Sequence, residues 1–282
     1  MREQGFGEGI LAGAVATLAL AAFVLPVALL GWIGWRGLGA VSWTFLTSME
    51  SDFGAAGGVF YQAAGSMILI AAAALVAAPA SWCLAVFKEA YVAHDRFKRM
   101  IDTTLFTLNS VPSIVFGLFG YLCFVHTLGL GVSWVSGGLI LGLMILPTVT
   151  VSVAEGLVNL PREHKEAAAA LGLNRWQVIR STLWPASQPF LWTGLTLGLA
   201  RAAGETAPIF FTAAVFSGVT LPHSWRDPVV TLPTHIMTLA QEAANPVALE
   251  NSWGAALVLI VLVGFLSGLS WLVRRRNLRI SP

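Results

Sequence analysis

The chain has 282 residues, of which 56% are hydrophobic and 11% are charged, and its mean hydropathy is +0.76. A soluble globular protein carries roughly 25% charged residues, so this composition excludes a soluble protein and indicates an integral membrane protein. The net charge of +2 decides little, because in a membrane protein the position of each charge matters more than the sum.

Six apolar segments are predicted to cross the membrane, because a spanning helix needs about 20 predominantly apolar residues. The first is too long for a cleavable signal peptide and no A-x-A site follows it, so we interpret it as a retained span. We expect a tight turn at His126–Ser133 between the third and fourth spans. The predicted spans, in chain order, are Ile10–Trp35, Gln62–Phe87, two within Thr103–Ala154, Gln188–Phe216 and Trp253–Val273.

The segment between the last two spans, Leu221–Asn251, contains four prolines. Between them, Thr234–Ala244 has a helix-like composition and is interpreted as a short helix near the outer surface. An irregular loop is the alternative.

Basic residues divide unequally between the two sides that these spans define. The side opposite the termini keeps Arg36 and Arg226. Lysine and arginine favour cytoplasmic loops, so we predict an all-α polytopic protein with both termini in the cytoplasm. The basic residues on that side are Arg2, Lys88, Arg96, Lys98, Arg99, Arg162, Lys165, Arg175, Arg180, Arg274, Arg275, Arg276 and Arg279.

Sequence patterns typical of catalysis are absent. The chain has no G-x-x-x-x-G-K-[ST], H-E-x-x-H, C-x-x-C or G-x-S-x-G pattern, so it lacks the usual devices for binding nucleotide phosphates, ligating zinc or activating a serine. Cys83 and Cys123 lie in apolar stretches and are expected to be small buried hydrophobic residues. We therefore expect no enzyme activity, no cofactor and no metal in this chain.

Arg201 and Glu205 stand out because they lie near the middle of the fifth predicted span. A charge at the centre of a spanning helix costs roughly 2.5–3.5 kcal/mol even on lenient scales, so such residues face a protein interior or a wet path. The two side chains are one helical turn apart and could form a purely local ion pair. The hypothesis that we favour is a polar pathway. In it, the Arg201 guanidinium attracts a tetrahedral oxyanion such as phosphate, Glu205 keeps binding weak enough for release, and Pro208 breaks the helix just beyond.

A second stretch, Asn109–Gly120, begins the third span with Pro112 and the hydroxyl of Ser113. Such a start suits a helix that lies near another helix or a polar path, and ordinary helix packing explains it equally well. Close helix approach is also expected at three G-x-x-x-G pairs, namely Gly138/Gly142, Gly194/Gly198 and Gly264/Gly268.

Between the fourth and fifth spans lies a polar segment, Leu160–Pro185. We predict two short helices here, broken at Gly172 and bounded by Pro161 and Pro185. Proline is tolerated in a first helical turn, and glycine ends helices by adopting a positive φ. A compact helical segment held between spans indicates a docking element.

This segment contains Glu166-Ala167-Ala168, then Gly172 after three further residues, and Pro185 thirteen residues later. This pattern resembles the EAA loop of ATP-binding-cassette (ABC) importer permeases, which is the contact point for the cytoplasmic ATPase. The chain departs from the usual pattern at Thr182 and Trp184. The resemblance implies that the residues that couple to the ATPase are Glu166, Ala167, Ala168, Gly172 and Pro185.

Two further stretches, Val111–Phe119 and Ala200–Pro208, are similar to signatures of phosphate-specific transport permeases. Leu232–Ile236, followed by an outer helix and a last span that contains Trp253, resembles the PstA-type subunit of that family. The resemblance implies that Arg201, Glu205, Ser113 and Thr206 line the substrate pathway.

This resemblance extends over roughly Ala64–Arg276 and implies the six-span ABC importer (MetI-like) permease fold in the bacterial plasma (inner) membrane. Residues 1–62 would form an N-terminal span and outer loop. Residues 63–282 would form the permease core, with a coupling loop at 160–187 and an outer loop at 217–251.

The implied function is ATP-driven import of inorganic phosphate into the cytoplasm. The implied partners are a PstC-type homologous permease, a PstB-type ATPase dimer and a PstS-type phosphate-binding protein. Two alternatives stay open. One is the same fold moving another oxyanion, such as sulfate or molybdate. The other is a non-transporting membrane scaffold or sensor component, in which Arg201 is only structural.

Overall fold

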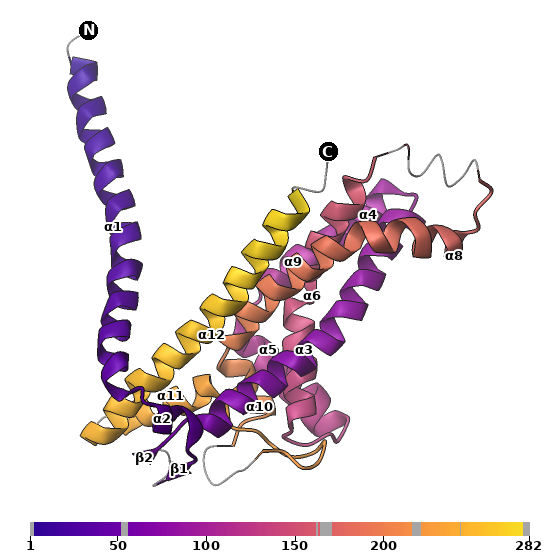
Figure 1. Ribbon diagram of the computed structural model, residues 1–282. Coiled ribbons are helices and arrows are strands. Elements are labelled where there is room, and N and C mark those ends of the chain that lie inside the picture. The colour runs from indigo at the N-terminus through magenta and orange to yellow at the C-terminus, as the bar shows by residue number, and fades with distance from the viewer. Residues whose placement is uncertain are drawn as a thin grey trace.

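The computed structural model describes residues 3–51, 56–161, 163, 171–215, 221–242 and 244–278. Most of these residues are helical (Figure 1). The α-helices are α1 (Glu3–Ala40), α2 (Trp43–Thr47), α3 (Phe60–Val86), α4 (Asp95–Ser110), α5 (Ser113–Gly120), α6 (Trp134–Val158), α8 (Arg175–Val178), α9 (Trp184–Ala203), α10 (Ala207–Thr212), α11 (Leu232–Gln241) and α12 (Pro246–Leu278).

Three π-helical segments extend these helices, and two short strands pair near α2. The segments are η2 (Phe87–Tyr91) after α3, η3 (Tyr121–Thr127) after α5, and η4 (Ile179–Leu183) between α8 and α9. The strands β1 (Glu50–Ser51) and β2 (Ala56–Gly57) are antiparallel. The predicted all-α polytopic fold is confirmed.

The core forms where α3, α6 and α9 approach closely through small residues. A Cβ atom at Gly138 of α6 would lie 2.5 Å from Ala72 Cβ on α3, and one at Gly194 of α9 would lie 2.6 Å from Ser152 Cβ on α6. Packing through these two glycine pairs is therefore confirmed. In the described part of the chain, nothing lies within 4 Å of the Cβ positions of Gly264 and Gly268, so the prediction is wrong for that pair.

By length and composition, four helices could cross a membrane: α1, α3 with η2, α6 and α12. A bent pair, α4 with α5–η3, would make a fifth. The fifth predicted span, Gln188–Phe216, begins in α9, which carries Gln188 and Arg201 and is too polar to be counted among these helices. A sixth crossing stays a prediction.

The predicted third span is not one straight helix. It begins earlier than expected, at Asp95, and α4 and α5–η3 are bent by 97° at Val111 and Pro112. Proline lacks an N–H and disfavours the α conformation in the residue before it. Val111 accordingly has ψ 131° and Pro112 has ψ 138°. The predicted turn after this span is confirmed, with Gly129 and Gly131 at φ 63° and 72°.

The fifth predicted span is also interrupted. It begins at Trp184, and α9 ends at Ala203 with Gly204 as its C-cap; the chain resumes as α10, with Pro208 in the first turn. The outer helix is confirmed as α11, at Leu232–Gln241 in place of Thr234–Ala244. The backbone N–H of Leu232 donates to Ser66 Oγ at 2.9 Å, which fixes the start of α11 on α3.

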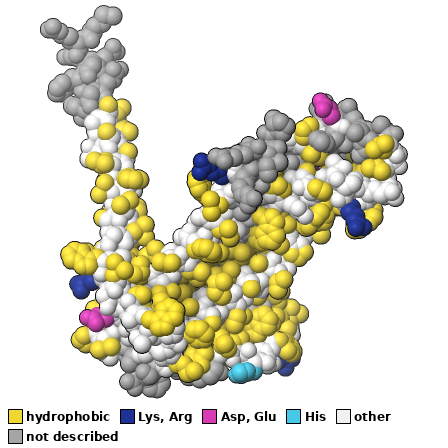
Figure 2. All heavy atoms as spheres, in the orientation of Figure 1, with side chains coloured by type: hydrophobic (Ala, Val, Ile, Leu, Met, Phe, Trp, Pro, Cys, Tyr) yellow, Lys and Arg dark blue, Asp and Glu magenta, His cyan; other side chains and the backbone are white. Residues whose placement is uncertain are grey.

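Different helices and strands lie at the two ends of the molecule. The start of α1, the end of α12, α4 and α8 lie at one end, whereas α2, the two strands, α10 and α11 lie at the other (Figure 1). This division matches the two sides predicted from basic residues. Hydrophobic side chains cover the flanks between them (Figure 2).

Helix α1 stands apart from the other helices along most of its length. It meets α12 near its end, where a Cβ at Gly37 would lie 2.7 Å from Leu257 Cβ (Figure 1).

The two cysteines do not lie where they were expected. Cys83 is exposed and Cys123 is half-buried, so the expectation that both are buried is wrong. Their apolar neighbourhoods are helix faces turned outward, where composition alone does not distinguish lipid-facing from core positions.

Candidate functional site: the junction of two interrupted helices

The Arg201 side chain joins the ends of two helices that are far apart in the sequence. Its Nη1 donates a hydrogen bond to Asn109 Oδ1 at 2.7 Å, and its Nε lies 3.8 Å from Glu205 Oε1. Asn109 lies in the last turn of α4, and Arg201 lies in the last turn of α9. The guanidinium therefore connects the α4–α5 bend with the α9–α10 break.

The position of Arg201 differs from the prediction. The prediction placed it near the middle of a span with a break at Pro208, whereas the structure places it in the last turn of α9, three residues before the C-cap Gly204. The unpaired carbonyls at a helix C-terminus carry partial negative charge and favour a cation there. The local backbone thus offsets part of the free-energy cost of placing an arginine between apolar segments.

The segments that follow the two interruptions also touch. A Cβ at Gly117 of α5 would lie 2.9 Å from the carbonyl oxygen of Ala207 and 3.1 Å from Pro208 Cα. Only glycine allows α5 and α10 to approach this closely. The half-buried Ser113 and Thr206 lie one turn before Gly117 and one residue before Ala207, respectively. The structure thus brings Arg201 together with Glu205 and places Ser113 and Thr206 on the adjoining segments.

This arrangement leaves hydrogen-bonding capacity on a reachable cation. The Arg201 and Glu205 side chains are 37% and 17% exposed. A guanidinium has five N–H donors, and in the described part of the chain its polar partners are Asn109 and Glu205. Donors therefore remain for an oxyanion. Asn109 was missed as a site residue, because its amide pairs across a sequence separation of 92 residues.

Of the five residues predicted to couple to an ATPase, Glu166, Ala167 and Ala168 lie outside the described residues. Gly172 has φ 67°, the left-handed conformation that glycine adopts most readily. After it, Asn174 and Gln177 form a capping box, each side chain bonding the other residue's backbone N–H at 2.9 and 2.8 Å. The predicted turn at Gly172 is therefore present, whereas the short helix predicted before it lies outside the described residues.

Pro185 does not end a second short helix, contrary to the prediction. From Arg175 the helix continues through η4 and Pro185 to Ala203, so this part of the polar segment is the first part of α9 (Figure 1). A π-helical turn immediately before the proline alters the local bonding pattern, which accommodates the missing N–H without a break. The second half of the polar segment is thereby one continuous helix with Arg201.

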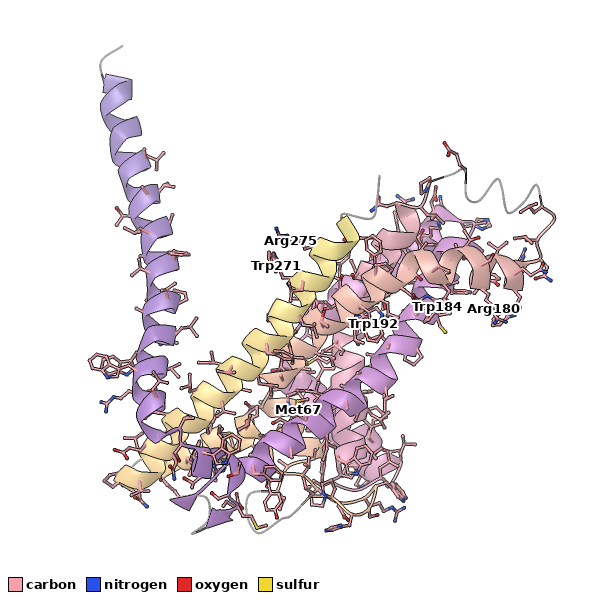
Figure 3. The ribbon with its side chains drawn as sticks, in the orientation of Figure 1. Met67, Arg180, Trp184, Trp192, Trp271 and Arg275 are labelled. Atoms are coloured by element: carbon pink, nitrogen blue, oxygen red, sulfur yellow. The ribbon has the colours of Figure 1, made fainter. Side chains whose placement is uncertain are left out.

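Aromatic contacts attach the start of this helix to α3. Trp184, labelled in Figure 3 beside Arg180, packs edge-to-face on Trp82 with ring centroids 4.9 Å apart. Trp82 Nε1 donates to Ser187 Oγ at 2.8 Å. One departure from the EAA pattern, Trp184, thus has a packing role. Nearby, the Arg175 guanidinium lies 5.4 Å from the ring centroid of Tyr91.

A charged cluster that sequence reasoning missed joins η2 to α4 at the same end. Lys88 Nζ lies 2.5 Å from Asp102 Oδ1 and 3.2 Å from Glu89 Oε1, and Lys98 Nζ lies 3.3 Å from Glu89 Oε2. The Lys88 and Glu89 side chains are largely buried, at 11% and 13% exposure. The cluster fixes α4 to the end of α3. The charged residues are visible in the sequence. Which of them pair depends on how the turn between η2 and α4 brings the two segments together.

The fold and the junction define a class: a polytopic membrane permease whose interrupted helices meet at an arginine. Residues 77–276 match the family model described as binding-protein-dependent transport system inner membrane component. The chain belongs to this family of transport permeases.

Curated relatives and a solved structure agree with that membership. The chain is 30% identical over 270 residues to the probable ABC transporter permease protein YqgI of Bacillus subtilis, covering 89% of this chain and 90% of the relative. It is 31% identical to the phosphate transport system permease protein PstA of Haemophilus influenzae, covering 82% and 84%. It is 34% identical to PstA of Mycobacterium leprae, covering 88% and 82%.

The solved structure is a crystal structure of an amino acid ABC transporter with histidines. It matches with a TM-score of 0.53 at 16% identity, covering 76% of this chain and 92% of that chain. This likeness concerns the fold alone.

Proposed function

We propose that this chain is one of two permease subunits of an ATP-driven importer that moves inorganic phosphate into the cytoplasm. The observation that carries the proposal is the place of Arg201, at the meeting point of two interrupted helices with spare N–H donors. The names of the PstA relatives support phosphate as the anion.

The chemistry of the junction suits a transient oxyanion site. A guanidinium stays charged at all physiological pH values, and its planar donors match the oxygens of phosphate. Glu205, at 3.8 Å from Nε, competes with the anion for the same cation. Such competition keeps binding weak, and transport requires release as well as capture.

Energy would come from a partner, since the sequence has no nucleotide-binding pattern. In this proposal a PstB-type ATPase dimer contacts the segment around Gly172, a PstC-type permease completes the pathway, and a PstS-type protein delivers phosphate from outside. Motion of the ATPase would reach Arg201 along the continuous helix that begins at Arg175. The chain would lie in the bacterial plasma membrane with both termini in the cytoplasm, and would itself not be an enzyme.

Reconstitution in proteoliposomes tests this proposal. The four components are combined, and ATP hydrolysis and anion uptake are measured with phosphate, sulfate or molybdate. We expect stimulation and uptake with phosphate alone. Equal or greater stimulation by sulfate or molybdate would reassign the substrate, and no stimulation by any anion would favour a scaffold or sensor role.

A further inference from the structure

We infer that Asn109 is a positioning residue for transport: it holds the Arg201 guanidinium at the junction through a neutral acceptor that an arriving anion displaces. The inference rests on the proposed function and adds a residue to it. It follows from the 2.7 Å hydrogen bond between Arg201 Nη1 and Asn109 Oδ1.

The position of Asn109 makes it more than a local helix-end contact. The residue lies directly before Ser110, where α4 ends, and the 97° bend follows. Its partner, Arg201, lies in the last turn of α9, three residues before the C-cap Gly204 at the α9–α10 break. The hydrogen bond therefore connects the α4–α5 bend with the α9–α10 break. The adjoining segments α5 and α10 are in contact at Gly117.

The chemistry of the amide suits this role. An amide oxygen accepts one N–H from the guanidinium without neutralising its charge, so Arg201 is oriented and still attracts an anion. A carboxylate at the same place would form a close ion pair with Arg201. An anion would then have to displace a charged carboxylate in place of a neutral amide dipole, which is less favourable.

The variants Asn109→Asp and Asn109→Ala separate positioning from a merely structural role. Asp has the shape of Asn and keeps the acceptor, so a structural role predicts that Asn109→Asp is the milder change. The positioning role predicts the reverse order. We expect Asn109→Asp to lower phosphate turnover at least about tenfold. Asn109→Ala should lower it by only about threefold, because the Arg201 side chain is 37% exposed and water can accept the freed N–H in place of the amide oxygen.

The experiment uses the reconstituted four-component complex and varies the concentration of phosphate-loaded binding protein. We expect the loss in the maximal rate, with an unchanged half-saturating concentration, because the junction is not a docking surface for the binding protein. Ser110→Ala is the matched control. Ser110 is the next residue, is exposed, and bonds back only to the Thr107 carbonyl at 2.8 Å in the described structure, so it should match the unsubstituted complex.

Arg201→Gln is measured in parallel, so that a failure of the positioning role of Asn109 can be told from a failure of the proposed phosphate-import function. If Arg201→Gln loses uptake while Asn109→Asp is equal to or milder than Asn109→Ala, the positioning role is overturned and the proposed function stands. If Arg201→Gln retains uptake, the pathway role of Arg201 is wrong and the role of Asn109 falls with it. Equal amounts of assembled complex, checked by co-purification, make the rates comparable.

Discussion

The left-handed turn at Gly172 provides a sharp test of the coupling segment. Gly172 has φ 67°, and no atom of the described residues lies within 4 Å of where its Cβ would be. A side chain there meets no steric neighbour among the described residues, so we expect its cost to be that of the backbone conformation. For a residue with a Cβ atom this cost is about 1–2 kcal/mol, equivalent to a factor of about 5–30 in the population of the native turn.

If this turn shapes the surface that contacts the ATPase, the affinity for the ATPase should fall by the same factor. The series Gly172→Asn, Gly172→Ala and Gly172→Val should weaken binding in that order, because Asn tolerates positive φ and a β-branched residue does not. Binding of the purified ATPase to the permease pair in nanodiscs measures the effect.

Gly264→Ala is the matched control for this series. Gly264 also has open space around its Cβ position but lies within α12, so alanine should be tolerated there. Unchanged affinity across the Gly172 series would refute the reasoning. So would a loss that follows side-chain size and ignores tolerance of positive φ.

Two further predictions concern stability. His235 is buried in α11, and burial lowers its pKa to about 4. The unfolded chain therefore binds the extra proton between about pH 6.5 and 4, so stability should be constant above pH 6.5 and fall by about 2 kcal/mol at pH 5. Thermal unfolding of the detergent-solubilised protein should show this fall, and His235→Phe should flatten it; an equal fall in the variant would contradict the assignment. In the charged cluster, Glu89→Gln should lower Tm more than Asp102→Asn. Glu89 contacts both lysines and is 13% exposed, whereas Asp102 contacts one and is 36% exposed. The opposite ranking would show that the cluster is not held by Glu89.

Features that depend on local composition could be predicted from the sequence. The apolar helices follow from length and hydropathy, the break at Gly172 follows from glycine's access to positive φ, and the short outer helix follows from its neighbouring prolines. The position of Arg201 next to an interruption was also visible, because Pro208 follows it closely.

Features that depend on pairing or on the exact backbone path could not be predicted. The bond between Asn109 and Arg201 joins residues 92 positions apart, and no local pattern signals it. Pro185 was interpreted as a helix boundary, whereas a π-helical turn lets the helix pass through it. Likewise, the apolar run around Pro112 concealed a bend of 97°, since hydropathy does not record direction.

The most direct test of the central claim is phosphate uptake by the reconstituted complex that carries Arg201→Gln. Each charge-assisted hydrogen bond contributes about 1.5–3 kcal/mol, so loss of the guanidinium should reduce the rate at least about tenfold, with membrane insertion and ATPase co-purification intact. Arg201→Lys keeps the charge without the planar donors, so its uptake rate should lie between those of the unsubstituted complex and Arg201→Gln. Undiminished uptake by Arg201→Gln would contradict a phosphate pathway through this junction.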